Sequence, residues 1–155
     1  MKKTTTLILV LFANYFAFAQ DTCSSAPTIS AGLHVVTAVN GTQIPNPLCA
    51  ANGAGATAGE WYIYVPTQTY TTTVSSNIAQ NNPKVDTRFH VYSGTCGTLT
   101  CVGGDDDSGT GYSSVGSFTA NAGTTYYIAW DNRWSSTGFT FQLSEATYVP
   151  PVPTP

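Results

Sequence analysis

Short segments in which apolar and polar residues alternate restrict the fold of this chain more than any other feature. Residues 139–143 read Phe-Thr-Phe-Gln-Leu, and residues 124–130 place Tyr126, Ile128 and Trp130 on one face. A strand with one buried and one solvated face needs this alternation. We find no helical periodicity beyond residue 19, so the pattern predicts an all-β protein.

Clusters of Gly, Pro and Asn divide the chain into about eight such strands at regular spacing, which is typical of a two-sheet antiparallel β-sandwich. The clearest strands are expected at residues 32–39, 60–65, 70–76, 86–94, 113–120, 124–130 and 139–143. The Pro and Gly content of residues 40–55 predicts a long loop, because neither residue supports continuous strand pairing. Residues 103–109, which are rich in Gly and Asp, are expected to form a second loop.

Two of the expected strands make specific predictions about burial. Residues 60–65 place Trp61, Ile63 and Val65 on one face, and this face is expected to enter the core. In residues 86–94, Phe89 and Val91 are expected to be buried. The residues between them, Arg88, His90 and Tyr92, should then face water.

The two ends of the chain differ in composition from the middle. Residues 1–19 combine Lys2 and Lys3 with an apolar stretch and end in Ala-Phe-Ala, which predicts a cleaved secretory leader. Residues 146–155 are rich in Pro and predict an extended linker or tail. We therefore expect one β-sandwich domain over residues 20–145, secreted and with no membrane span once the leader is removed.

Four cysteines in an exported chain indicate two disulfides. Three pairings are open, and the spacing favours Cys23 with Cys49 and Cys96 with Cys101. Four residues separate Cys96 from Cys101, a gap that a tight loop could close at disulfide distances. Neither a CxxC pair nor a His cluster accompanies these cysteines, so a metal site built on them is disfavoured.

Charge excludes some classes of partner. Beyond the leader, the strong bases are Lys84, Arg88 and Arg133, against eight acids in the whole sequence. An excess of acid disfavours nucleic acids and anionic membrane surfaces as partners.

The runs Tyr-Ser-Gly-Thr-Cys-Gly-Thr-Leu at residues 92–99 and Ala-Gly-Thr-Thr-Tyr-Tyr-Ile at residues 122–128 resemble the pre-peptidase C-terminal-type β-sandwich domains of secreted bacterial proteins. The resemblance covers nearly the whole chain beyond the leader and implies a jelly-roll-like sandwich that accompanies enzymes or adhesins. The chain is also similar to CUB domains. That similarity implies a calcium-binding role for Asp86, which opens the equivalent strand.

Acidic residues near the expected strand ends suggest a calcium site. Calcium takes six to eight oxygen ligands, and loops at one end of a sandwich can gather carboxylates for it. The candidate ligands are Asp86, Asp105, Asp106, Asp107 and Asp131. The alternative is a solvated acidic turn that contributes only to solubility.

Aromatic and polar residues next to the same loops suggest a surface for sugars. Trp134 is the Trp expected to be exposed, with Tyr112, Asn132 and Arg133 as further candidate contacts. Aromatic rings supply apolar area for stacking on sugar rings, and exposed aromatic patches often mark binding sites.

Catalysis has little support in the sequence. His34 and His90 stand alone and are expected on strand surfaces, and no nucleophile elbow, His-Glu-x-x-His pair or phosphate loop is present. We therefore expect a non-catalytic adhesion or accessory binding module for an extracellular polysaccharide or protein surface. The alternatives are a carbohydrate-binding module attached to a secreted enzyme and a structural subunit that self-assembles through a strand edge.

Overall fold

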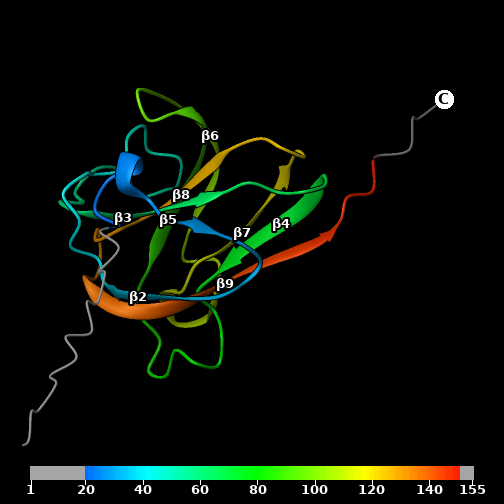
Figure 1. Ribbon diagram of the computed structural model, residues 1–155. Helices are drawn as coiled ribbons and strands as arrows, with labels where there is room; N and C mark the ends of the chain where they lie inside the picture. The colour runs from blue at the N-terminus through cyan, green and yellow to red at the C-terminus, as the bar shows by residue number, and fades with distance from the viewer. Residues whose placement is uncertain (1–19, 151–155) are drawn as a thin grey trace, which may run out of the picture.

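Two β-sheets pack face to face in the computed structural model, which describes residues 20–150 (Figure 1). One sheet has five strands in the order β1-β3-β8-β5-β6, and the other has four in the order β2-β9-β4-β7. Every pairing is antiparallel except that of β1 with β3, which is parallel. The predicted all-β, two-sheet sandwich is confirmed.

Seven of the nine strands in residues 20–150 lie on segments expected from the sequence, and β1 and β6 do not. The five-stranded sheet contains β1 (Thr28–Ile29), β3 (Gly59–Tyr64), β5 (Arg88–Thr95), β6 (Thr98–Asp106) and β8 (Tyr126–Asp131). The four-stranded sheet contains β2 (Gly32–Ala38), β4 (Tyr70–Ser75), β7 (Val115–Ala120) and β9 (Thr137–Thr147). Two short 3-10 helices, η1 (Cys23–Ser25) and η2 (Thr110–Tyr112), complete the fold. Among residues 20–150, no helix is long and apolar enough to cross a membrane.

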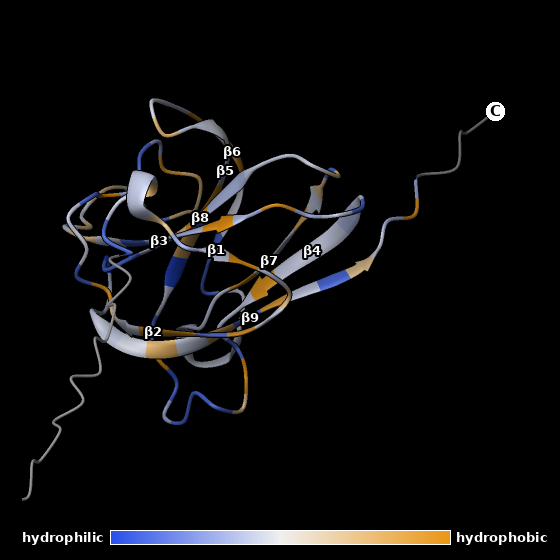
Figure 2. Ribbon diagram, in the orientation of Figure 1, coloured by the Kyte–Doolittle hydropathy of each residue, from blue (hydrophilic) through white to orange (hydrophobic). Residues whose placement is uncertain are grey.

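The main core lies between the two sheets. Tyr126, Ile128 and Trp130 of β8 face it, as the alternation predicts, and they pack against Phe139 and Phe141 of β9. Hydrophobic and hydrophilic segments occur on both strands and connections, and much of the strand ribbon is of intermediate hydropathy (Figure 2). Burial of aromatic side chains from both sheets therefore holds the sandwich together.

Two strands were not expected from the sequence. The β1 strand has only two residues, too few for an alternating pattern. The β6 strand includes Gly103 and Gly104, and its pairing with β5 extends through Asp105 and Asp106. Strand pairing therefore overrides the loop-like composition of this segment. At the other end of the chain, β9 extends to Thr147, two residues beyond the expected domain boundary.

Trp61 is buried, but on the face opposite to the predicted one. The alternate residues Tyr62 and Tyr64 enter the core between the sheets. Trp61 instead packs with Cys23, Tyr92 and Ala129 on the outer face of the five-stranded sheet. The N-terminal segment covers this face, so both faces of β3 are buried and alternation alone could not identify the inner one.

The prediction that Arg88, His90 and Tyr92 face water is wrong. Their relative exposures are at most 1%, as low as that of Phe89 on the opposite face of β5. The long loop of residues 40–58 folds over the outer face of β5: Tyr92 donates to Pro47 O at 2.8 Å, and Arg88 donates to Ala51 O at 3.0 Å. A covering loop, unlike a sheet, leaves no periodic signal in the sequence.

The two disulfides join Cys23 to Cys96 and Cys49 to Cys101, so the pairing expected from spacing is wrong. Cys96 lies in the turn between β5 and β6, whereas Cys101 is on β6 opposite Tyr92. Extended strands carry these two residues apart, so each pairs with a segment that crosses the outer face of the sheet. Two disulfides indicate an oxidising setting, while the predicted leader at residues 1–19 lies outside the described residues.

Candidate cation site and aromatic rim

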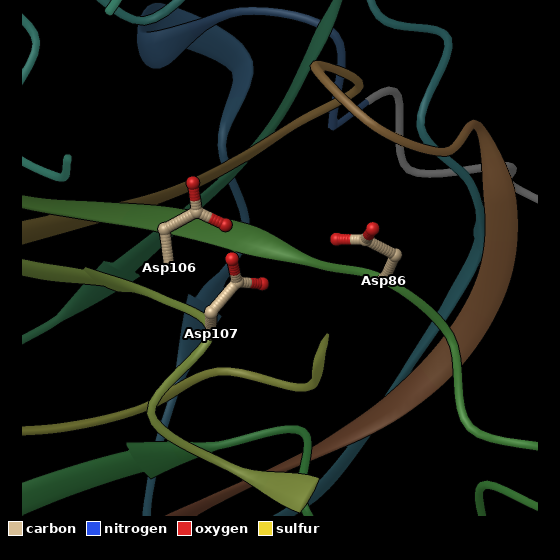
Figure 3. A group of neighbouring side chains, drawn as sticks. All are labelled: Asp86, Asp106 and Asp107. Carbon is tan, nitrogen blue, oxygen red and sulfur yellow. The ribbon is translucent and has the colours of Figure 1, made fainter. Parts of the chain in front are cut away.

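Asp86, Asp106 and Asp107 come together at one end of the sandwich. Asp106 ends β6 and pairs with Arg88 of β5, so the antiparallel register carries Asp86 beside the turn that follows β6. Asp107 occupies that turn with φ +78°, a left-handed conformation that Asp tolerates better than most residues. Figure 3 shows the three carboxylates directed toward a shared space.

The geometry of this group suits a cation with oxygen ligands. One carboxylate oxygen from each residue lies within 4.8 Å of the other two, and two ligands of one calcium ion, each at about 2.4 Å, are separated by no more than about that distance. Asp86 Oδ1 and Asp106 Oδ1 are buried and accept no hydrogen bond from the described residues. Buried oxygens without a donor are costly, and a cation would satisfy both.

Burial, together with repulsion between the carboxylates, disfavours ionisation of Asp86 and Asp107. Burial raises the pKa of Asp86, and the charges of Asp107 and Asp106 raise it further. For Asp107, burial again comes first among the causes that raise its pKa, followed by the charges of Asp106 and Asp105. The three carboxylates therefore form an arrangement that costs free energy without a compensating positive charge.

Asp105, predicted as a ligand, belongs to a turn and not to this group. Its carboxylate accepts from Ser108 N at 3.1 Å, from the Ser108 hydroxyl at 2.5 Å and from Val115 N at 2.8 Å. Alternation along β6 explains the separation, because the side chains of Asp105 and Asp106 leave opposite faces of the strand. Asp105 fixes the start of β7 against the end of β6.

Asp131 was also predicted as a cation ligand, but it is committed to a buried ion pair. Asp131 Oδ2 accepts from Arg88 Nε at 2.9 Å, lies 2.7 Å from Arg88 Nη2, and lies 2.8 Å from His90 Nε2. Burial opposes ionisation of Asp131, yet the hydrogen bonds from His90 and Arg88 outweigh it and hold its pKa below the usual value. Asp131 is therefore a charged partner of Arg88 beneath the 40–58 loop.

His90 is held in one neutral tautomer by its surroundings. Its Nδ1 accepts from the backbone N–H groups of Cys49 at 3.0 Å and Ala50 at 3.2 Å, so this nitrogen carries no proton. Nε2 then carries the proton and donates to Asp131. His90 is fully buried, so its expected place on a strand surface is wrong.

The same loop reaches the acidic group through Asn52. Asn52 Nδ2 donates to Asp106 Oδ2 at 2.7 Å, and Arg88 Nη1 donates to Gly53 O at 2.7 Å. Residues 49–53 thus connect the buried ion pair to the candidate cation site. Sequence reasoning missed Asn52, because an Asn-Gly pair in a long loop signals only a turn.

Trp134 forms the aromatic rim of the candidate cation site. It is 46% exposed, as predicted, and its Nε1 donates to Asp106 Oδ2 at 3.1 Å. The Arg133 guanidinium lies 4.6 Å from the ring centroid of Trp134, a cation–π distance that occupies one ring face. The indole is therefore oriented by two contacts while much of it stays in contact with solvent.

The other two predicted sugar contacts have different settings. Tyr112 is 66% exposed, and its backbone C=O accepts from Thr87 N at 3.1 Å, next to Asp86 in sequence. Asn132 holds the long loop, since its Oδ1 accepts from Thr57 N at 2.7 Å and Ala58 N at 3.0 Å. Tyr112 remains a candidate contact, whereas the amide of Asn132 is already used within the fold.

A scan against family models matches no family, and searches of the curated proteins and of the solved structures return no match. The similarity to pre-peptidase C-terminal-type and CUB domains therefore stays a prediction. Independent of any family, residues 20–150 form a two-sheet β-sandwich without α-helices. At one end this sandwich carries an acidic cluster that could hold a metal.

Proposed function

We propose that this chain is an exported, non-catalytic module that adheres to an extracellular polysaccharide or protein surface, with calcium stabilising its binding end. The observation that carries the proposal is the convergence of Asp86, Asp106 and Asp107 beside the exposed Trp134. Here a cation would neutralise repelling carboxylates and fix the residue that orients the indole. The buried His90 and Asp131 support a non-catalytic role, because the 40–58 loop separates them from solvent.

Calcium fits the donor set better than softer metals. All the candidate ligand atoms are carboxylate oxygens, which suit hard cations, and carbonyl oxygens or water can complete a flexible shell. Calcium sites in extracellular modules bind with Kd values of about 10⁻⁴–10⁻³ M. At 10 mM calcium, such a site stabilises the folded state by roughly 1.4–2.7 kcal/mol.

Thermal unfolding of residues 20–155 with calcium and with chelator tests the cation site. We expect Tm to rise by roughly 5–10 °C in 10 mM calcium, and chelator to reverse the rise. In Asp107→Asn the calcium effect should disappear, because Asn keeps the left-handed backbone but removes one charge. Without calcium this variant should melt above the wild type, since repulsion is relieved. Asp21→Asn, outside the acidic group, should keep the full calcium effect; equal calcium effects in both variants would refute the site.

A carbohydrate-binding module is the second candidate, and the setting of Trp134 favours it. Its ring is held by Asp106 on one side and by Arg133 across one face, so little side-chain entropy is lost when a sugar stacks on the remaining surface. The neighbouring carboxylates can accept hydrogen bonds from sugar hydroxyls. On this reading the acidic group contributes polar contacts as well as a calcium site.

Affinity electrophoresis in gels containing soluble neutral polysaccharides separates the two candidates. If sugar is the ligand, the wild type is retarded and Trp134→Ala loses at least about tenfold in affinity, which corresponds to roughly 1.4 kcal/mol. Val65→Ala provides a matched control, because Val65 is an exposed apolar residue (41%) at the end of a different strand. Retardation that is equal in all three proteins would reject Trp134 as the contact.

A further inference from the structure

Within residues 20–150, other parts of the chain contact three sides of the two sheets over part of their length. On the β1 side of β3, Trp61 N donates to Gln20 O at 2.8 Å and Ile63 N donates to Pro27 O at 2.8 Å. The strands β6 and β7 approach each other at one end, where Val115 N donates to the carboxylate of Asp105 at 2.8 Å. On the side of β2 away from β9, no backbone hydrogen bond from another segment of residues 20–150 is present.

β2 also lacks the features that usually protect an edge strand. It is seven residues long, Gly-Leu-His-Val-Val-Thr-Ala, with no Pro, Lys, Arg, Asp or Glu. Its outward side chains include Leu33 and Val35, which are 51% and 64% exposed. Natural edges are commonly short, charged or interrupted by Pro, so an edge of this kind can accept another strand.

The contacts of Thr140 define which backbone groups of β2 face outward. Thr140 N donates to Asn81 Oδ1 at 2.9 Å, and Thr140 O accepts from Asn81 Nδ2 at 2.7 Å. Both backbone groups of Thr140 therefore point away from β2. Opposed residues of an antiparallel pair either exchange both bonds or both point away. Since Val35 is the register partner of Thr140, the N–H and C=O of Val35 face the open edge, as do those of Leu33 two residues earlier.

We infer that β2 pairs antiparallel with β2 of a second copy of this chain, about a two-fold axis at Val35. Val35 is the midpoint of Gly32–Ala38 and presents one donor and one acceptor, so two copies can exchange two bonds across the axis. Leu33 of one copy then stands opposite Thr37 of the other. The exposed Val35 side chains meet on the outer face, and no charge on β2 opposes the contact.

A second copy fits this edge better than a charged partner does. Identical acidic chains would repel each other through most surfaces, but β2 presents no charge to a copy of itself. A seven-residue edge buries less than the roughly 1,200 Å² of standard interfaces, so the dimer is weak.

Single-cysteine variants of residues 20–155 test this register directly. All four native cysteines are in disulfides, so Val35→Cys adds one free thiol. Paired residues at the axis have Cα atoms about 5.5 Å apart, within the range of a disulfide. In Leu33→Cys the two thiols are offset by four residues, about 14 Å along the strand. Diamide oxidation followed by non-reducing electrophoresis should therefore give at least fivefold more dimer with V35C than with L33C.

Sedimentation velocity on the proteins without added cysteine supplies the second measurement. The wild type should shift from monomer toward dimer between about 20 µM and 1 mM, as a weak interface requires. Val35→Lys should stay monomeric, because it places two like charges at the axis, while Thr119→Lys on β7 of the same sheet should dimerise like the wild type. A monomeric wild type, equal crosslinking of V35C and L33C, or growth beyond dimer would overturn the inference.

Discussion

Removal of the charge on Asp131 tests whether the buried ion pair holds the long loop in place. In Asp131→Asn the side chain keeps its shape, but Arg88 loses its counter-charge where both residues are almost fully buried. In the wild type, the backbone N–H of Arg133 donates to Asp131 Oδ1 at 2.9 Å. If the Asn oxygen of the variant faces Arg88 and His90, its NH₂ group faces this N–H, and two donors meet. Loss of one partner of a buried pair costs about 3–5 kcal/mol.

Urea unfolding at pH 7 measures this cost. With a typical slope of about 2 kcal/mol per molar urea, the midpoint should fall by about 2 M. Hydrogen exchange should also speed up at the amides of Cys49 and Ala50, which donate to His90. Asp21→Asn serves as the control: its carboxylate makes no hydrogen bond to the described residues, and its effect should stay within about 0.5 kcal/mol. A fall of under about 0.5 M in Asp131→Asn, with unchanged exchange at these amides, would refute the reasoning.

Two further predictions concern the disulfides and pH. Replacing Cys49 and Cys101 by Ser removes a link across 52 residues, and loop entropy predicts a loss of about 4 kcal/mol in urea unfolding; a loss under about 1 kcal/mol would contradict it. The raised pKa values of Asp86 and Asp107 mean that the folded state holds protons more tightly than the unfolded state. Without calcium, Tm should therefore rise as pH falls from about 7 to 5, while the lowered pKa of Asp131 acts in the opposite direction only below about pH 4. Over the same range the Tm gain from calcium should shrink, because protons compete for the carboxylates; a gain that grows on acidification would contradict the proposed site.

Alternation predicted burial correctly where one face of a strand meets solvent or the opposite sheet. The inward residues of β8, Tyr126, Ile128 and Trp130, follow the pattern because a single sheet covers that face. Arg88 and His90 do not, because a loop distant in sequence covers them and supplies polar partners for both. The loop supplies hydrogen-bond partners for the buried Arg88 and His90 but leaves the alternation of apolar and polar residues in β5 unchanged. The sequence therefore predicted that both residues face water.

Pairing between distant segments limited the prediction of the site. The sequence could place Asp86 and Asp106 near strand ends, and the structure brings them together with Asp107. The sequence does not show that Asp105 and Asp131 lie apart from this group, because their hydrogen-bond partners depend on strand register and on the 40–58 loop. The partners are Ser108 and Val115 for Asp105, and Arg88 and His90 for Asp131. The prediction of the cysteine pairs was wrong for the same reason, because the number of residues between two cysteines does not give their distance across a hairpin.

The N-terminal cover of β3 affects how the protein can be handled in the laboratory. Gln20 accepts from Trp61 N at 2.8 Å and from the Tyr62 hydroxyl at 2.9 Å, so residues added directly before it emerge against a sheet edge. The described chain ends on the opposite side of the molecule, beyond β9 (Figure 1). Affinity tags, fluorophores and surface-coupling groups therefore belong after Thr147, where they leave the β3 edge and its aromatic cluster undisturbed.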